Sequence, residues 1–329
     1  MPTIVYFDSD VDRSVLHDKA IAVLGYGAQG RSHALNLRDS GVQVIVGQRP
    51  GSRRHADAVA DGFSPVALAE AVRSANVISL LLPDELHGPI FRAEINPHLN
   101  AGQVLMTCHG YSLHYGHVVP PEGVAAVLVA PKAAGHRVRS AFVEGTGVPF
   151  LIALGKGADE QTKAVGLAYA AAMGGARVGI FETTVEAETE TDLFGEQAVL
   201  CGGVSHLVKA AFDTLIAAGY QEELAFFECV HELKLVVDLI HRGGLAYMHD
   251  HISNTAEFGD YTRGPRIVDE RVRATLCDIL GEIRSGKFAR QMQAEFDSGQ
   301  TVMNRHRAAE RESLVEQVGR RLRQLMNLT

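Results

Sequence analysis

Two pairs of acidic residues stand out in the second half of this 329-residue chain. Asp192 and Glu196 lie in the stretch ETETDLFGEQAVLCGG, and Glu228 and Glu232 lie in LAFFECVHELKLVVDLI. Each pair has i, i+4 spacing, which places both carboxylates on one face of a helix, where like charges repel by about 0.2–0.5 kcal/mol. Acids also interact favourably with the dipole at a helix N-terminus, so the first pair alone has an ordinary structural explanation.

The second pair lies in an apolar segment, where carboxylates need a compensating partner. Residues 224–240 are apolar on nearly every side, which predicts a largely buried helix. An ionised carboxylate buried without compensation costs several kcal/mol, and Lys234 is not at i+3 or i+4 from either glutamate. Four carboxylates on two helices therefore predict a site for hard cations such as Mg²⁺, because such ions prefer oxygen ligands. The alternative is two unrelated acidic helix faces.

Composition limits the remaining classes of function. The net charge is −8 and the pI about 6.0, which argues against a general nucleic-acid-binding surface. The N-terminal residues lack the pattern of a secretory signal, and no run approaches the roughly 18 uncharged apolar residues of a membrane span. The four cysteines are scattered without a Cys-x-x-Cys pair. We expect a reduced, cytoplasmic protein without nucleic-acid or membrane partners.

The first half of the chain alternates short apolar runs with helical stretches. The runs are apolar throughout rather than at every second residue, as in a parallel sheet covered on both faces. Strands are expected at residues 20–25, 42–47, 76–83, 103–108, 124–131, 149–154 and 176–181. The alternation predicts a Rossmann-like α/β domain.

After about Glu182 the strand pattern stops, and the sequence predicts only helices, several of them separated by glycine. The charged C-terminal segment RHRAAERESLVEQVGRRLRQLM predicts one amphipathic helix with a solvated polar face. We therefore expect an α/β domain at residues 1–182 and an all-α domain at residues 183–329. Apolar faces on the helices predict a homo-oligomer, a dimer or larger.

A glycine motif marks the nucleotide site of the first domain. Gly25-x-Gly27-x-x-Gly30 lies directly between an expected strand and an expected helix. In this context the first glycine permits a tight turn, the second lets the backbone approach a pyrophosphate, and the third allows close helix–strand packing. The helix N-terminus then offers free N–H groups to the phosphates.

The end of the second strand predicts which nucleotide binds. An NAD-preferring site places an acid here for the ribose 2′-hydroxyl. This strand ends instead in GQRPGSRRH, residues 47–55, which contains three arginines and a serine. Because arginine pairs with phosphate through its planar fork, the loop predicts NADPH, with an ordinary basic surface loop as the alternative.

Two further side chains follow later strands. His109 lies in TCHGYSLHYG and Lys132 in VAPKAAGH, each just beyond an expected strand. Residues that leave the carboxyl ends of such strands line the ligand crevice. Both are therefore candidates to approach the nicotinamide or the substrate, although each could equally serve packing.

Taken together, these motifs resemble ketol-acid reductoisomerase, in its short form with a single helical domain. The resemblance runs from about residue 10 to near the C-terminus. It implies an α/β domain followed by an all-α domain that is knotted, a rare feature that no periodicity shows. It is carried by GYGAQG, LLPDE, HGYSLHYG, ETETDLFGEQAVLCGG, ECVHELKLVVDLI and ISNTAEFGDYTRGPRI.

The resemblance assigns a role to each acid. It implies two Mg²⁺ ions, with Asp192 bridging both, Glu196 on one, and Glu228 and Glu232 completing the site. Ser253 is implied to meet the substrate carboxylate, and His109 and Lys132 match active-site positions of the family. Besides the glycine loop, the implied NADPH contacts are Tyr26, Ala28, Gln29, Arg49, Ser52, Arg54, Asp84, Glu85, Leu86, His87 and Gly135.

The implied reaction uses both halves of the chain. The substrate is a 2-hydroxy-3-keto acid, 2-acetolactate or 2-aceto-2-hydroxybutyrate, whose oxygens two hard cations can chelate and polarise. An alkyl group migrates, and NADPH then reduces the rearranged acid to a 2,3-dihydroxy acid, a step in valine and isoleucine synthesis. Glu232, or a water that it orients, is the candidate proton shuttle.

The sequence departs from the family pattern at a few positions. Ala133 and Ala134 follow Lys132 where the family usually has Gly-Pro, Arg54 replaces a serine, and His87 replaces a glutamine. None of these changes touches the four carboxylates. The alternatives are a metal-independent NADP-dependent β-hydroxyacid dehydrogenase, which leaves the acid pairs unexplained, and a non-catalytic NADPH-binding protein.

Overall fold

The computed structural model describes residues 3–327, which divide into two compact units. The boundary falls between Thr191 and Asp192, inside helix α8 (Val185–Gly195). The sequence placed it after residue 182, just before this helix begins. One helix therefore belongs to both units.

The first unit is built on a sheet whose strands run in the order β1-β8-β7-β6-β5-β4-β2-β3. Neighbouring strands among β3, β2, β4, β5 and β6 are parallel. The Rossmann-like α/β prediction is confirmed. The strand bounds are β1 Val5–Tyr6, β2 Ala20–Leu24, β3 Gln43–Gly47, β4 Val77–Leu80, β5 Val104–Thr107, β6 Ala125–Pro131, β7 Phe150–Leu154 and β8 Ile180–Glu182.

The sheet corrects two strand predictions. It is not parallel throughout, because β7 runs antiparallel to β6, and β1, which was not predicted, runs antiparallel to β8. The run expected at residues 176–181 begins in a 3₁₀ turn, Gly175–Arg177, and becomes a strand only at Ile180. A continuous apolar run reports burial on both faces, which a central strand has whichever way it runs.

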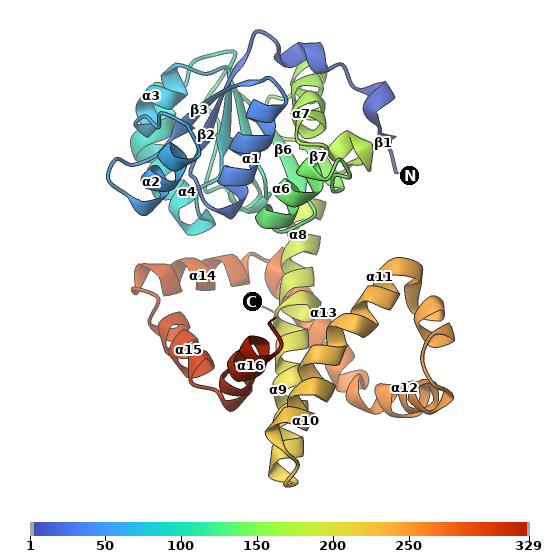
Figure 1. Cartoon of the computed structure of the whole chain (residues 1–329). Coiled ribbons are helices and arrows are strands. Elements are labelled where there is room, and N and C mark those ends of the chain that lie inside the picture. Colours follow the sequence, from blue (N-terminus) through green and yellow to red (C-terminus); the bar gives the residue numbers. More distant parts are fainter. Residues whose placement is uncertain (1–2, 328–329) are drawn as a thin grey trace. The chain divides into compact units, whose positions relative to one another are not determined.

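Helices cover both faces of the sheet (Figure 1). Apolar residues of α1 (Ala28–Asp39), α6 (Gly135–Val143) and α7 (Glu160–Ala172) join one core cluster, and those of α3 (Leu68–Arg73) join the cluster on the other face. Every residue of β2 and β4 is buried, which explains their unbroken apolar sequence. The unit also contains α2 Arg53–Ala60, α4 Asp84–Ile90 and α5 Tyr111–His114, the 3₁₀ turns Asp8–Asp10, Arg13–Leu16 and Asn96–His98, and the π-helix Phe91–Ile95.

The described part of the second unit is entirely helical. A small core forms where α9, α10 and α16 pack together around Phe212, Phe226 and Leu322. Two π-helices interrupt its long helices, Glu196–Leu200 after α8 and Phe227–His231 after α10. The α-helices are α9 Gly202–Ala217, α10 Glu222–Phe226, α11 Glu232–Asp250, α12 Asn254–Ile267, α13 Glu270–Arg284, α14 Lys287–Asp297, α15 Thr301–Arg311 and α16 Leu314–Leu325.

Two helices of this unit are broken. Gly244 has a positive φ (φ 84°, ψ −178°), a non-helical conformation that glycine adopts readily, so α11 is two helices meeting at the RGG sequence. The C-terminal segment predicted as one helix is two, because Ser313 has extended backbone between α15 and α16.

Much apolar surface of the second unit is uncovered within one chain. Leu207, Leu235 and Leu245 are 53%, 53% and 63% exposed. The prediction that residues 224–240 form a largely buried helix is therefore wrong for the single chain, because only Ala225 and Phe226 of this stretch are buried. The long helix Val185–Ala217 is apolar and long enough to cross a membrane by length and composition alone. The helix begins with acidic residues and contains Lys209 and Asp213, so it is not the uncharged run that the sequence analysis excluded.

A buried polar chain crosses the core of the first unit. His33 on α1 is 1% exposed, and its Nδ1 lies 2.8 Å from the hydroxyl of Tyr169, which lies 3.0 Å from Oγ of Ser79. Burial lowers the pKa of His33 to about 3, because the charged ring would lose its hydration. His33 is therefore neutral in the folded protein near neutral pH.

We expect the free energy of unfolding to decrease as the pH falls below about 6.5, because the unfolded chain then binds a proton at His33 that the folded chain refuses. The loss continues towards pH 3, at no more than about 1.4 kcal/mol per pH unit from this group. Urea denaturation at a series of pH values measures it. The control is His33→Asn, which removes the titration. Equal pH slopes for the two proteins would contradict the assignment.

Candidate active site

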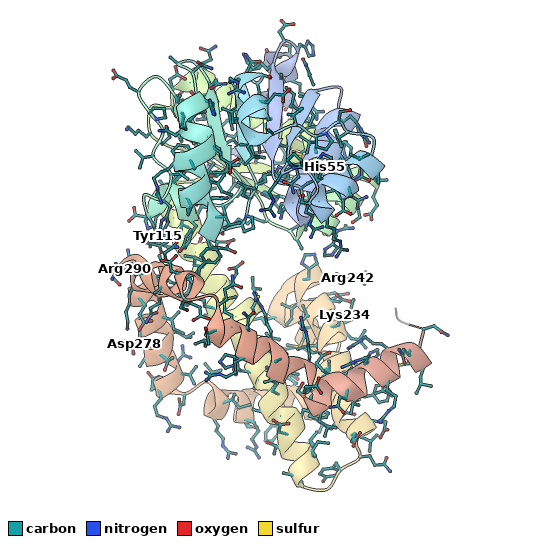
Figure 2. The ribbon with its side chains drawn as sticks, turned by 90° about the vertical axis from the view of Figure 1, so that its left-hand side faces the viewer. His55, Tyr115, Lys234, Arg242, Asp278 and Arg290 are labelled. Carbon is teal, nitrogen blue, oxygen red and sulfur yellow. The ribbon has the colours of Figure 1, made fainter. Side chains whose placement is uncertain are left out.

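The candidate residues of the first unit collect at one edge of the sheet. Parallel strands β2, β3, β4, β5 and β6 all end at this edge, so the loops after them surround one crevice. Figure 2 labels His55, one turn into the helix after β3, and Tyr115, at the end of the short helix after β5. The parallel order of the strands places these loops along one edge of the sheet, as the sequence predicted.

The glycine motif has the geometry of a phosphate-binding turn. Gly25 has φ +100°, and a Cβ there would lie 2.6 Å from the carbonyl oxygen of Leu81. A Cβ on Gly30 would lie 2.1 Å from the carbonyl oxygen of Gly25, so the third glycine lets α1 start tightly against the turn. Gly27 has open space around it. Because α1 begins at Ala28, the backbone N–H groups of its first turn can face a phosphate.

Tyr26 faces inward rather than towards a ligand. Its side chain is 1% exposed, stacks edge-on against Phe63, and donates a hydrogen bond of 2.9 Å to Asp61. Asp61 also accepts two bonds from Arg31, which lower the pKa of its carboxyl group. Only the backbone of Tyr26 is therefore available to a nucleotide.

The start of α6 packs directly on the glycine loop. A Cβ on Gly135 would lie 2.3 Å from the carbonyl oxygen of Ala28, and the hydroxyl of Ser32 donates to the carbonyl oxygen of Gly135. The side-chain nitrogen Nε2 of Gln29 donates to the carbonyl oxygen of Ala133 at 3.0 Å. Gly135 thus holds two loops together at the cofactor side of the crevice.

The basic loop after β3 is organised by Ser52. Its hydroxyl caps α2 by accepting from the N–H of His55 and donates to the carbonyl oxygen of Arg49 at 2.9 Å. Arg49 and Arg54 are exposed, and Arg54 forms an ion pair of 3.3 Å with Asp57. The loop therefore presents guanidinium groups around a fixed helix N-terminus, which suits a phosphate.

The first turn of α4 carries the residues predicted at 84–87. Asp84, Glu85 and Leu86 are half-buried, whereas His87 is 3% exposed. Nε2 of His87 lies 2.8 Å from the carbonyl oxygen of Leu82 and must donate to it, so Nδ1 accepts from Ser112 at 2.6 Å. Burial lowers the pKa of His87, and the ring serves as a neutral brace.

Asp84 links this turn to His109. Its carboxylate oxygens lie 3.6 Å from Nδ1 of His109 and 3.8 Å from Nδ1 of His87. The ring of His109 is parallel to that of Tyr111, which is 2% exposed. Burial raises the pKa of Tyr111 to about 12, so its hydroxyl stays protonated. His109 is thus held in a fixed orientation at the crevice.

Glu188 is a candidate site residue that the sequence analysis did not predict. Its carboxylate is 1% exposed and accepts one bond from Nζ of Lys132 and one from the N–H of Gly110, both at 2.9 Å. A Cβ on Gly110 would lie 2.0 Å from Oγ1 of Thr189, so only glycine lets α8 approach this closely. A signal was present, since Glu188 is one turn before Asp192 in a row of acids spaced by four.

One potential ligand group appears among the described residues. His109, Glu188 and Asp192 each offer an atom, and these atoms lie within 4.8 Å of one another. Oxygen donors predominate, as a hard divalent cation prefers, and Lys132 already balances the charge of Glu188. The residues therefore fit a divalent cation near Asp192.

The other predicted ligands do not join this group within the described chain. Glu196, Glu228 and Glu232 are exposed, and each lies at a π-helix of the second unit. Ser253 is the N-cap of α12, where its Oγ accepts from the N–H of Ala256. Its own hydroxyl hydrogen remains available to an anion.

Solved structures of low identity share this architecture. A semialdehyde dehydrogenase NAD-binding protein from Cupriavidus necator, in complex with calcium and NAD, is similar over 82% of this chain and 99% of its own, at 20% identity and TM-score 0.61. Pyrroline carboxylate reductase of Plasmodium falciparum, with NADP bound, matches at 14% identity, TM-score 0.52, and 82% and 98% coverage. These matches show the fold, in which a sheet domain with a glycine turn of the dinucleotide-binding type precedes a helical unit.

Closer matches define the family. Residues 15–179 match the acetohydroxy acid isomeroreductase NADPH-binding domain, and residues 185–328 match the ketol-acid reductoisomerase C-terminal domain. An NADH-preferring ketol-acid reductoisomerase from an uncultured archean is 41% identical, with TM-score 0.95, over 98% of this chain and 99% of its own. The chain belongs to the ketol-acid reductoisomerase family, as the sequence motifs predicted.

Proposed function

We propose that the protein catalyses the Mg²⁺-dependent conversion of 2-acetolactate, or 2-aceto-2-hydroxybutyrate, to the 2,3-dihydroxy acid with NADPH, in the cytoplasm, for valine and isoleucine synthesis. The observation that carries the proposal is the buried Glu188 carboxylate beside Asp192 and His109. A dehydrogenase that works without metal has no use for such an acidic cluster.

Four carboxylates would hold the cations, Asp192, Glu196, Glu228 and Glu232. When bound, Mg²⁺ supplies Lewis-acid polarisation of the substrate hydroxyl and ketone. Exposure of the last three carboxylates in the single chain leaves them accessible to metal and substrate.

The chain's own side chains would orient the substrate. Lys132 and the N–H of Gly110 fix Glu188, and Asp84 and Tyr111 fix His109, so these groups need little reorganisation on binding. Ser253 would donate its hydroxyl hydrogen to the substrate carboxylate at the N-terminus of the 14-residue helix α12, where backbone N–H groups also favour an anion. Glu232 would carry the proton.

We expect NADPH oxidation with 2-acetolactate to require Mg²⁺ and to fall at least about 100-fold in Asp192→Asn, because the change removes one anionic metal ligand. The assay is run with Mg²⁺, with excess chelator, and with Glu186→Gln, an exposed acid of the same helix, as the control. Turnover that persists in chelator would replace the proposal with a β-hydroxyacid dehydrogenase. NADPH binding without any turnover would favour a non-catalytic protein.

The basic loop supports NADPH as the preferred nucleotide. Arg49 and Arg54 are exposed beside the capped end of α2, and an acid that would read a 2′-hydroxyl is absent from residues 47–55. The 41% identical relative prefers NADH, so the family contains both preferences. The loop of this chain, rather than the family, carries the proposal.

Ser52→Asp tests this assignment. Both Asp and Asn cap helices well, so α2 should persist in Ser52→Asp and in the control Ser52→Asn. Only the former places a negative charge where the 2′-phosphate would bind. We expect the ratio of kcat/KM for NADPH to that for NADH to fall at least about tenfold more in Ser52→Asp than in Ser52→Asn. Equal ratios in the two variants would refute the 2′-phosphate site.

We further propose that the chain works as a homo-oligomer, a dimer or larger, built through the second unit. Exposed apolar residues are concentrated there, including Leu207, Leu245, Phe258 and Ile267. Extensive exposed apolar surface is typical of an interaction site. A second copy of the chain would also cover the apolar faces that residues 224–240 leave uncovered.

We expect sedimentation to give a mass of at least two 35.5-kDa chains. Leu207→Glu should shift the protein towards smaller species, because it places a charge in the proposed apolar contact. Val143→Glu is the matched control, since Val143 is similarly exposed, at 67%, but lies in the first unit. A wild-type monomer at micromolar concentration would rule out the oligomer.

A further inference from the structure

The two acid pairs coincide with two π-turns. Beyond Glu196 the N–H of Cys201 bonds to the carbonyl oxygen of Glu196 at 3.0 Å, five residues back. In the second pair, Glu228 lies inside a π-helix that closes when the N–H of Glu232 bonds to the carbonyl oxygen of Phe227. Such turns are rare in proteins, and those that are found often lie at functional sites.

A π-turn sets the direction in which side chains before it point relative to those after it. One extra residue in a helix changes this phase by about 100°. The turn, whose first residue is Glu196, joins α8, which carries Asp192, to α9, which packs through Phe212 against α10 and α16. α9 also contacts the π-helix that contains Glu228. The turn therefore fixes how the first acid pair faces relative to the core that carries the second.

Two glycines lie directly against the carbonyl groups of this turn. A Cβ on Gly202 would lie 2.1 Å from the carbonyl oxygen of Gln197, and a Cβ on Gly203 would lie 2.1 Å from that of Ala198. Both carbonyl groups are five residues back and belong to the π-helix. Neither glycine has a positive φ, so glycine is needed here for space and not for its backbone angles. By contrast, a Cβ on Gly195 would meet nothing nearer than 3.9 Å.

We propose that Gly202 and Gly203 are positioning residues that keep the turn at Glu196 in the π form, and so direct Asp192 and Glu196 towards the cation. This inference rests on the proposed metal-dependent function. It explains why two residues unfavourable to helices begin the 16-residue helix α9. A side chain at either position forces the turn towards the α form and rotates Asp192 and Glu196 relative to Glu228 and Glu232.

Mn²⁺ titration of the full-length protein tests the inference, with NADPH binding measured beside it. We expect Gly202→Ala and Gly203→Ala each to weaken Mn²⁺ binding at least about tenfold. NADPH affinity should stay within about twofold, because the glycine loop belongs to the first unit. Gly195→Ala is the matched control and should match the wild type in both. Wild-type Mn²⁺ affinity in both alanine variants at 202 and 203 would overturn the inference.

A further variant distinguishes a change in helix phase from a loss of protein stability. Deleting Ala198 in Gly202→Ala shortens the turn to the α length and relieves the clash. We expect this variant to regain the wild-type melting temperature but not Mn²⁺ affinity. Recovery of Mn²⁺ affinity would show that the phase does not matter and would overturn the inference.

The failure of the proposed function has a different signature. If the wild type binds no Mn²⁺, the metal-dependent function fails. The claim that Gly202 and Gly203 keep the turn in the π form is then tested by hydrogen exchange at the Cys201 amide. The bond of this amide to Glu196 should be lost in Gly202→Ala and kept in Gly195→Ala. Equal protection in these two variants would refute it.

Discussion

The candidate site depends on one buried carboxylate. Glu188 is satisfied from both sides, by an ammonium group that follows β6 and by a backbone N–H that follows β5. A buried charge is tolerable only when it is paired and hydrogen-bonded in this way. The pairing fixes the start of α8 against the ends of two strands, and α8 in turn carries Asp192 one turn further on. The chain therefore holds its acidic helix through an interaction whose loss would leave an uncompensated charge in the interior.

The two units obtain their stability differently. The first has large apolar clusters on both faces of its sheet, whereas the described part of the second has a small core around α9, α10 and α16 and much exposed apolar surface. A long helix that is apolar yet uncovered looks like a membrane span by composition. The same composition suits a helix covered by another protein chain, and the acids at its start agree with that explanation.

Sequence patterns predicted what depends on local chemistry. The sequence predicted the strand runs, the glycine turn between β2 and α1, and the change to helices after residue 182. Each of these depends on residue types within a short segment, through burial or backbone freedom. The direction of β7 was not, since apolar runs do not encode it. Glu188 was overlooked although it continues the acid row, because its partners Lys132 and Gly110 are distant in sequence. The π-turns were invisible, because an i, i+4 spacing is compatible with both kinds of turn.

The hydrogen bond between Gln29 and Ala133 affects which substitutions the protein can tolerate near the glycine loop. Gln29 donates to the main-chain carbonyl of Ala133, so the link between the two loops does not depend on which side chain residue 133 carries. A substitution at residue 133 would therefore keep this hydrogen bond between the two loops. Gly135, by contrast, has no room for even a methyl group. The main-chain bond at residue 133 thus tolerates substitution, whereas the packing at residue 135 requires glycine.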